Sequence, residues 1–284
     1  MGGLAARRFG GLSTLAVAVL TAQPPNRLAA QQVAPNRAIA YLFPTSVQDA
    51  RAIWVNPARL AVQREASIYA ELAVDKPGSK GQLRQINFGF NSRGLSLGYQ
   101  RDILDNGVRG STYRLGLAGG SGGLAVGFDI ARYEGGGTHA TGWDLGTSYV
   151  VLPSLTVAVV ATNLGQPIVR GLRQRLTFVP GFTWQPPPVR ALALSADARL
   201  NTDSVQSYAF GAAWRVASDS RWPLEIIARL DTDGGLRRGA FALGFSLGGQ
   251  DRGGLVASTP GDVSRIGTLS LYGLSTRQPS PGRP

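Results

Sequence analysis

Apolar and polar residues alternate along the chain from residue 66 almost to its end. In one stretch the apolar positions are Leu124, Val126, Phe128 and Ile130, and the positions between them are Ala125, Gly127, Asp129 and Ala131. A period of two places successive side chains on opposite faces of a β-strand. The stretches run for roughly ten residues, which exceeds the usual strand of soluble proteins and matches a tilted crossing of a bilayer.

About fourteen such stretches follow one another, an even number as expected of a bacterial outer-membrane barrel. They begin near Ala66, Gln82, Gly94, Gly110, Gly122, His139, Ser154, Arg175, Arg190, Ser204, Trp222, Leu236, Gly253 and Arg265. Short glycine-bearing turns separate many of them, as hairpins require. We therefore predict an all-β fold, a transmembrane antiparallel β-barrel of about fourteen strands. The stretch Gly253 to Ser258 is the weakest, so twelve strands is an alternative.

A soluble β-sandwich would also alternate, and two features oppose it. The polar face consists mainly of small residues with isolated charges, as in a crowded lumen. Aromatic residues recur near strand ends, as in the girdles of membrane barrels: Tyr99, Trp143, Tyr149, Trp184, Trp214, Trp222 and Tyr272. This parity predicts that Leu97 and Phe128 face lipid and that Gln100 and Asp129 face the lumen.

The stretch from Ser46 to Leu60 is the one convincing helical segment. Ser46 and Asp49 have the spacing of a capping box, and Pro57 ends that helix because the residue before a proline avoids the helical region. Asn56 and Pro57 suit the start of a second short helix through Leu60. Only residues 62–65 join this unit to the first strand, and four extended residues span at most about 14 Å. We expect a hatch inside the barrel or across its periplasmic mouth, with Ile53, Trp54 and Leu60 on the wall.

The predicted hatch residues are Ser46, Asp49, Arg51, Trp54, Asn56, Pro57, Arg59 and Leu60. Arg51 and Arg59 are expected to meet lumen carboxylates such as Asp129 or Asp144, which offsets the cost of their desolvation.

Charges on the polar parity of the strands are predicted to face the lumen. They are Glu71, Arg114, Asp129, Asp144, Asp197, Arg199, Glu225, Arg229 and Arg238. Both signs are present, so we expect pairing across the lumen and to the hatch, because unpaired charges in a narrow interior are costly. A selectivity filter is the alternative role.

The ends of the chain divide it further. Residues 1–30 have the pattern of a secretory signal peptide, with Arg7 and Arg8 before an apolar run and cleavage near residue 22 or 30. Residues 31–65 form a lead-in and the hatch, and the stretch from Gln23 to Phe43 is expected to be poorly ordered. The barrel is expected over residues 66–273, with a tail over 274–284.

The composition of the chain limits the classes of partner that we expect for it. The chain has 284 residues, no cysteine and a formal charge of +12. Its arginines are scattered singly along strands and turns, so no nucleic-acid surface is predicted, and outer-membrane lipids are the expected partner for the basic balance. The lack of cysteine excludes disulfides and thiolate zinc sites.

Candidate chemistry is sparse. His139 is the only histidine, and His139 with Thr141 does not make a nucleophile with a base and an orienting group. The glycines at 119, 120, 122 and 123 lack the lysine and the following helix of a phosphate-binding loop, so they predict a turn. We expect no enzyme, no cofactor and no metal.

The run Asn56-Pro57-Ala58-Arg59-Leu60-Ala61 resembles the signature that follows the signal peptide in PorV/PorQ-type outer-membrane barrels and the related long-chain fatty-acid porins. The stretch Leu255 to Leu271 also looks like the end of PorV-type proteins. The resemblance implies a fourteen-stranded barrel whose N-terminal segment folds into the lumen. Arg59 stands where the family has glycine, and the chain continues past Tyr272 without ending on an aromatic residue.

Two functions remain open, both in the bacterial outer membrane. The favoured one, implied by the resemblance, is a scaffold or adaptor in secretion or outer-membrane assembly, with secretion-machinery or secreted proteins as partners. The alternative is a gated channel for small or hydrophobic solutes of the fatty-acid porin type. Short loops and a lumen of small residues favour the scaffold, because they leave little room for a solute site.

Overall fold

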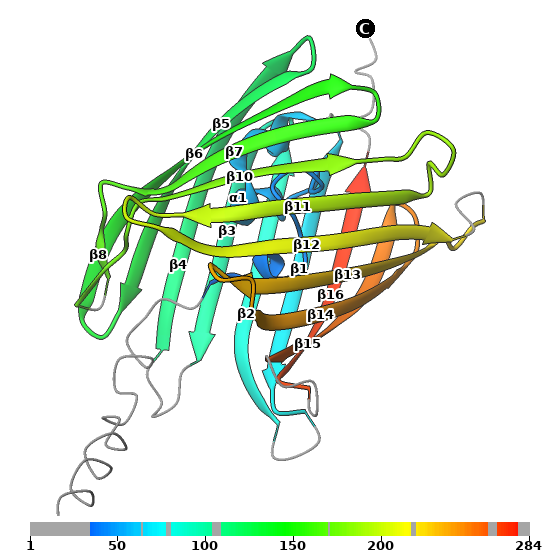
Figure 1. The fold of residues 1–284 in the computed structure, drawn as a ribbon. Helices are drawn as coiled ribbons and strands as arrows, with labels where there is room; N and C mark the ends of the chain where they lie inside the picture. The colour runs from blue at the N-terminus through cyan, green and yellow to red at the C-terminus, as the bar shows by residue number, and fades with distance from the viewer. Residues whose placement is uncertain are drawn as a thin grey trace, which may run out of the picture.

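A computed structural model describes residues 35–63, 65–77, 81–103, 109–169, 171–216, 220–260 and 266–277. Fourteen antiparallel strands close into one barrel, in which β1 pairs with β16 (Figure 1). The fold predicted from the alternation is confirmed, and the twelve-strand alternative is wrong. The expected signal peptide lies outside the described residues.

The barrel strands follow the chain order around the wall. They are β1 (Ala66–Asp75), β2 (Gln82–Ser92), β3 (Leu95–Ile103), β4 (Arg109–Ser121), β5 (Leu124–Gly135), β6 (Thr138–Leu152), β7 (Leu155–Leu164), β10 (Thr177–Trp184), β11 (Leu192–Leu200), β12 (Val205–Val216), β13 (Leu224–Asp233), β14 (Arg238–Leu247), β15 (Asp251–Pro260) and β16 (Thr268–Arg277). A separate hairpin of β8 (Ile168–Val169) and β9 (Leu172–Arg173) lies between β7 and β10. β15 is a full strand although it looked weakest in the sequence, and β16 extends beyond the expected barrel end at residue 273.

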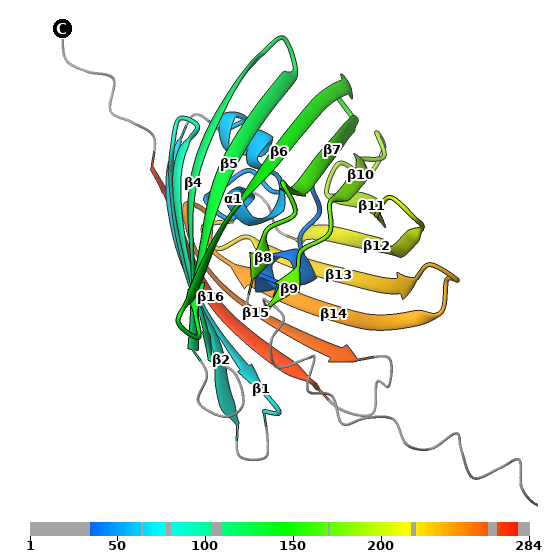
Figure 2. The ribbon, with the colours of Figure 1, turned by 90° about the vertical axis from the view of Figure 1, so that its left-hand side faces the viewer.

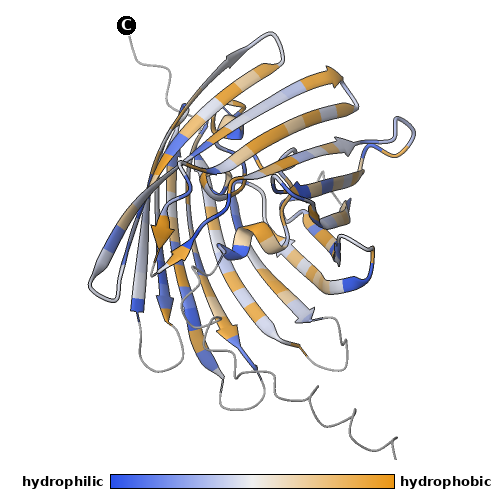
Figure 3. Ribbon diagram, turned by 60° about the vertical axis from the view of Figure 1, so that its left-hand side comes forward, coloured by the Kyte–Doolittle hydropathy of each residue, from blue (hydrophilic) through white to orange (hydrophobic). Residues whose placement is uncertain are grey.

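The two faces of the wall follow the predicted parity. Leu97 is 52% exposed and Phe128 36%, whereas Asp129 and Gln100 are 0% and 2% exposed. The outward positions form the apolar surface that lipid requires, visible as alternating colours along the strands in Figure 3. Of the predicted girdle, Trp143, Tyr149, Trp184, Trp214 and Trp222 are exposed.

Tyr272 departs from the predicted girdle. It is 3% exposed, faces inward from β16 and stacks on Tyr41 with ring centroids 5.9 Å apart. Its assignment to the girdle is wrong, because the strand parity at that position points into the lumen, where Tyr41 provides a partner. Tyr99 is half-buried and packs on the Tyr113 ring at 5.3 Å.

The strand connections lie at two ends of the barrel. We call the end where β1 begins and β16 ends the near mouth, and the opposite end the far mouth. Arg93-Gly94, Gly122-Gly123 and Pro153-Ser154 make tight turns at the near mouth, whereas the connection between β7 and β10, with its β8–β9 hairpin, lies at the far mouth. Both ends carry short and longer connections, since residues 136–137 make a two-residue turn at the far mouth and residues 185–191 join β10 to β11 at the near mouth.

Residues 35–61 lie inside the barrel (Figure 2). The name hatch, used above for the predicted helical stretch, refers from here on to all of residues 35–61. They contain η1 (Arg37–Ala40), α1 (Ala52–Val55) and η2 (Pro57–Ala61). Among the described residues, no helix is long and apolar enough to span a membrane. The hatch supplies most of the main buried apolar cluster, including Tyr41, Ile53 and Leu60.

Two expectations about the hatch are wrong. The helix starts at Ala52 and not at Ser46, because the Ser46 hydroxyl accepts a hydrogen bond from the Phe43 amide at 3.2 Å and closes a separate turn. Residues 35–43 are also not a poorly ordered lead-in, since Asn36 caps η1 and Ala38, Tyr41 and Phe43 are buried. By contrast, Asn56 caps η2 with Pro57 in its first turn, as the sequence predicts.

Candidate functional site

The hatch rests on wall glycines. A Cβ atom added at Gly127 or Gly146 would overlap the hatch at Pro57 or Asn56. One added at Gly98 would lie 2.8 Å from the Trp54 ring, and one at Gly116 would lie 3.0 Å from Leu60. These glycines face inward from β3, β4, β5 and β6, and we call them the glycine track. Their small size lets α1 and η2 approach the bare backbone of the wall.

Polar contacts hold the same half of the hatch. The Asn56 amide donates to the carbonyl of Pro44 at 2.9 Å and to that of Thr147 on β6 at 3.3 Å. Arg59 donates from Nε to the Val47 carbonyl at 3.0 Å and from Nη1 to the Ser148 hydroxyl at 3.2 Å. Burial lowers the pKa of Arg59 to about 10, which leaves it charged at neutral pH. Arg59 therefore ties two turns of the hatch to the wall.

The expected pairing of Arg51 and Arg59 with Asp129 or Asp144 is wrong. Arg51 forms a bidentate pair with Asp49, with Nη2 and Oδ2 2.7 Å apart. Asp129 and Asp144 instead share Arg114 of β4, at 2.7 and 2.5 Å. Each cation takes the nearest carboxylate that its own segment or sheet provides, so both pairs form without crossing between hatch and wall.

A second part of the hatch, residues 42–45, contacts the opposite wall of the barrel. We call these four residues the latch. Arg229 of β13 donates to the Leu42 carbonyl at 2.6 Å, and its guanidinium carbon lies 4.4 Å from the centre of the Phe43 ring. The Thr45 hydroxyl lies 2.6 Å from that of Thr183 on β10. Arg229 is held in turn by Asp197 at 3.4 Å and Asp231 at 2.9 Å. The buried Arg229 therefore holds the latch through a hydrogen bond to the Leu42 carbonyl and through its contact with the Phe43 ring.

The remaining predicted lumen charges take different positions. Glu71 is buried in the wall beside Asn87, and Glu225 bridges Arg252 at 3.2 Å and Arg215 at 3.6 Å. Arg199 lines a cavity on the far side of the latch. Arg238 is exposed at the start of β14, so its assignment to the lumen interior is wrong: the parity continues, but the strand has already reached the rim there.

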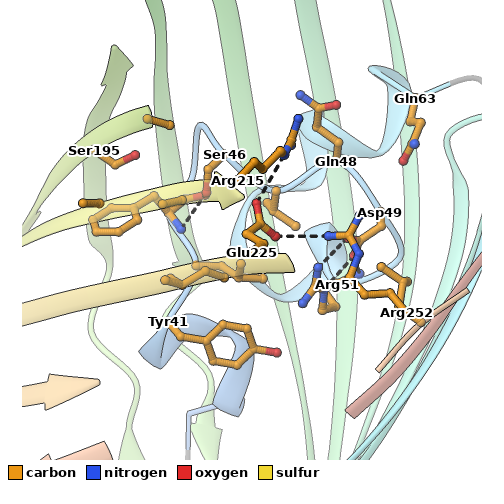
Figure 4. Close-up of a pocket in the computed structure, with 18 of the residues that line it drawn as sticks. Tyr41, Ser46, Gln48, Asp49, Arg51, Gln63, Ser195, Arg215, Glu225 and Arg252 are labelled. Atoms are coloured by element: carbon orange, nitrogen blue, oxygen red, sulfur yellow. Dashed lines mark hydrogen bonds and ion pairs between the residues drawn. The ribbon is translucent and has the colours of Figure 1, made fainter. Parts of the chain in front are cut away.

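Two cavities lie on either side of the latch. The far cavity, about 280 Å³, is lined by Leu42 and Pro44 together with Trp54, Arg114 and Arg199. The near cavity, about 180 Å³, is lined by Leu42 and Phe43 together with Arg51, Glu225 and Arg252 (Figure 4). Leu42 belongs to both linings. The latch therefore lies between the two cavities, together with other residues of the hatch.

Sequence reasoning missed several residues of this arrangement. Tyr41, Leu42 and Phe43 fell in the supposed lead-in, although the apolar run before Pro44 could have marked them. Arg252 precedes the short stretch taken as the thirteenth strand, so its inward parity went unnoticed.

The sites considered for catalysis show no assembled chemistry. His139 is exposed near the far end of β6 and pairs in register with Glu134. Over the residues that the structure describes, no group of three metal-binding side chains comes together.

A closed fourteen-stranded barrel with an apolar outer face and a plugged lumen defines the chain as an outer-membrane β-barrel protein of bacteria. No protein-family model matches the chain, and no curated protein matches it in sequence.

Solved structures provide the comparison. The Ralstonia pickettii toluene transporter TbuX is similar over 88% of this chain and 99% of its own, with a TM-score of 0.58 and 11% identity. The P. putida toluene transporter TodX is similar over 87% of this chain and 99% of its own, with a TM-score of 0.55 and 9% identity. At such identities the likeness establishes the shared fold.

Proposed function

We propose that the protein is a gated passage for small solutes across the outer membrane, closed here by the latch. The observation that carries this function is the position of residues 42–45 between two cavities that share Leu42. Leu42 and Phe43 line the near cavity, and Leu42 and Pro44 line the far cavity. The similar barrels TbuX and TodX are toluene transporters, which supports passage as the role of this fold.

The α1–η2 part of the hatch and the latch differ in how the wall holds them, as a gate with one fixed and one moving part requires. The α1–η2 half sits on the glycine track, where backbone meets backbone and movement would open voids. The latch is held by polar groups of Arg229, Thr183 and Asn56, which can exchange partners with water. We therefore assign the moving part to residues 42–45 and the fixed part to residues 52–61.

Replacing Arg229 with methionine tests the proposal. The change removes the donor to Leu42 and the cation against Phe43, so the latch should loosen and single-channel conductance in planar bilayers should rise several-fold. Arg132→Met is the matched control, because Arg132 pairs with Glu134 on an exposed rim and touches neither cavity. Equal conductance of both variants and the unaltered protein would contradict a gate at the latch.

A scaffold or adaptor for secretion or outer-membrane assembly is the second candidate. The close seat of α1 and η2 on the glycine track favours it, since a permanently filled lumen needs no passage. Its partners would be secretion-machinery or secreted proteins at the near mouth. A barrel that stays closed in the Arg229→Met test would favour this role.

A further inference from the structure

The outer face of the wall carries arginines near the far mouth on three neighbouring strands, β3, β4 and β5. Arg101 continues the lipid-facing positions Leu95 and Leu97 of β3, which are 49% and 52% exposed. Arg109 on β4 and Arg132 on β5 occupy outward positions of their strands in the same way. Side chains two residues apart along a strand point to the same face, so all three arginines project from the outside of the barrel. We call these three residues the basic patch.

The strand register brings the members of the basic patch close to one another. Arg101 lies opposite Ser111, and Arg109 is two residues before Ser111 on the same strand. Diagonal neighbours of this kind lie about 7–8 Å apart, within reach of two long side chains. Ser111 also lies opposite Glu134, two residues from Arg132, so the third arginine borders the first two.

A pair of tyrosines marks the membrane interface next to the basic patch. Tyr99 lies opposite Tyr113 in the register, and their ring centroids are 5.3 Å apart. Tyrosine favours the boundary between hydrocarbon and headgroups, because its ring is apolar and its hydroxyl is polar. Arg101 is two residues beyond Tyr99, about 7 Å farther along the strand, which places it at the height of the lipid headgroups.

The face on the other side of the tyrosines, toward the middle of the wall, is apolar and exposed. Leu97 and Leu115 lie opposite each other and are 52% and 44% exposed. On the next two strands, Phe128 packs on Trp143 with ring centroids 5.3 Å apart. A lipid whose headgroup is held at the basic patch would therefore lay its chains along a continuous apolar surface.

The basic patch has an excess of positive charge. Arg132 donates to Glu134 at 2.8 Å, and this carboxylate balances its charge. Arg101 donates to the uncharged Ser111 hydroxyl at 2.9 Å. In the part of the chain that the structure describes, no carboxylate pairs with Arg101 or Arg109. Two guanidinium groups therefore remain for an anion, and their forked donors match the oxygens of a phosphate.

We propose that the basic patch binds the phosphate of an anionic membrane lipid, with Arg101 and Arg109 as the cations that contact it. On the neighbouring strand β2, Arg84 pairs with Asp75 at 3.1 Å. A free phosphate would meet only the arginines, whereas a lipid also covers the apolar face with its chains, which favours the lipid as occupant. The site lies outside the barrel, so it does not depend on passage through the lumen.

The variant that carries Arg101→Gln and Arg109→Gln tests the site, because it removes both cations and keeps polar side chains. The probe is phosphatidylglycerol, titrated into the full-length barrel in a neutral detergent, and native mass spectrometry measures the bound lipid. A basic side chain near an anionic lipid changes affinity about fivefold, so this variant should bind about 25-fold more weakly. The unaltered protein should bind phosphatidylcholine, which has a phosphate but no net charge, far more weakly than phosphatidylglycerol.

The matched control carries Arg173→Gln and Arg175→Gln. Both arginines are exposed in the connection between β7 and β10, which packs through Val169 on the inner side of β5. The control therefore loses the same two charges at the same mouth, but on the other face of the wall, and should bind phosphatidylglycerol within twofold of the unaltered protein. Retained heat-modifiable migration shows that each variant is folded.

Three results would overturn the proposal. The first is equal affinity of the unaltered protein and the Arg101→Gln, Arg109→Gln variant for phosphatidylglycerol. The second is an equal loss of affinity in the control, which would indicate a general effect of charge. The third is displacement of the lipid by an equal concentration of inorganic phosphate, which would assign the two arginines to a free anion.

Discussion

Individual side chains in the lumen are paired within the hatch or within the wall, and few charges bridge the two. Arg51 takes Asp49, Arg114 takes Asp129 and Asp144, and the contacts between hatch and wall are mostly to backbone carbonyls and hydroxyls. Two wall arginines are exceptions, because they pair with wall carboxylates and also donate to the hatch: Arg229 to the Leu42 carbonyl at 2.6 Å and Arg114 to the Ile53 carbonyl at 3.4 Å. This separation allows part of the hatch to move without exposing an unpaired charge.

The Asp49–Arg51 pair should make stability depend on pH. Burial alone would raise the pKa of Asp49, but Arg51 outweighs it and holds that pKa below the ordinary value of 3.8. A lowered pKa in the folded state stabilises at pH values above 3.8, and this contribution is lost as pH falls through the lowered pKa. Asp49→Asn should therefore cost roughly 3 kcal/mol at neutral pH, and the difference from the unaltered protein should shrink in acid.

Urea unfolding in lipid vesicles between neutral pH and pH 3 measures that difference in free energy. A stability gap between Asp49→Asn and the unaltered protein that stays constant down to the acid end would show that the pair is not the source.

At the scale of elements, the glycine track determines where the hatch can lie. Gly127 and Gly146 face each other across β5 and β6, directly beneath Pro57 and Asn56. The inner surface of the wall has bare backbone there, because these inward-facing positions are glycines. The short 3₁₀-helix η2 fills that space and places Leu60 against Gly116.

Gly127→Ala should disturb this seat. The added methyl group would overlap the backbone of Pro57 and Ala58, and overpacking of this kind costs about 1–3 kcal/mol. Gly119→Ala is the control, since a Cβ there meets nothing within 4 Å. The urea concentration at which each variant unfolds is measured from the loss of its heat-modifiable electrophoretic migration. If the two variants unfold at the same urea concentration, the hatch does not rest on the track.

The sequence predicts the wall well and the hatch only in part. Period-two alternation predicts all fourteen strands and the orientation of Phe128 and Asp129, because each strand position depends only on its own parity. The position of Asn56 and Pro57 at a helix start can also be predicted from the sequence, because helix capping depends only on neighbouring residues. The partner of Arg51 depends on distances between segments, which no spacing rule gives. Residues 35–43 lack a regular period, so their burial could be recognised only once the lumen that receives them was known.

At the scale of the whole molecule, the barrel is a fixed cylinder and the hatch divides its interior into two cavities. Lipid-facing residues hold the cylinder in the membrane, and the glycine track holds α1 and η2. We assign the movement to residues 42–45, which are held by Arg229, Thr183 and Asn56. Transport of a solute would require that these residues leave the wall.

A disulfide between the latch and the wall tests this most directly. The chain has no cysteine of its own, and the hydroxyls of Thr45 and Thr183 lie 2.6 Å apart, close to the sulfur separation of about 2.05 Å in a disulfide. Conductance is measured for Arg229→Met carrying Thr45→Cys and Thr183→Cys, with Arg229→Met carrying Thr183→Cys alone as control. We predict that oxidation closes the first protein, that a reductant reopens it, and that the control conducts in both states. Undiminished conductance of the oxidised, cross-linked protein would contradict a gate formed by residues 42–45.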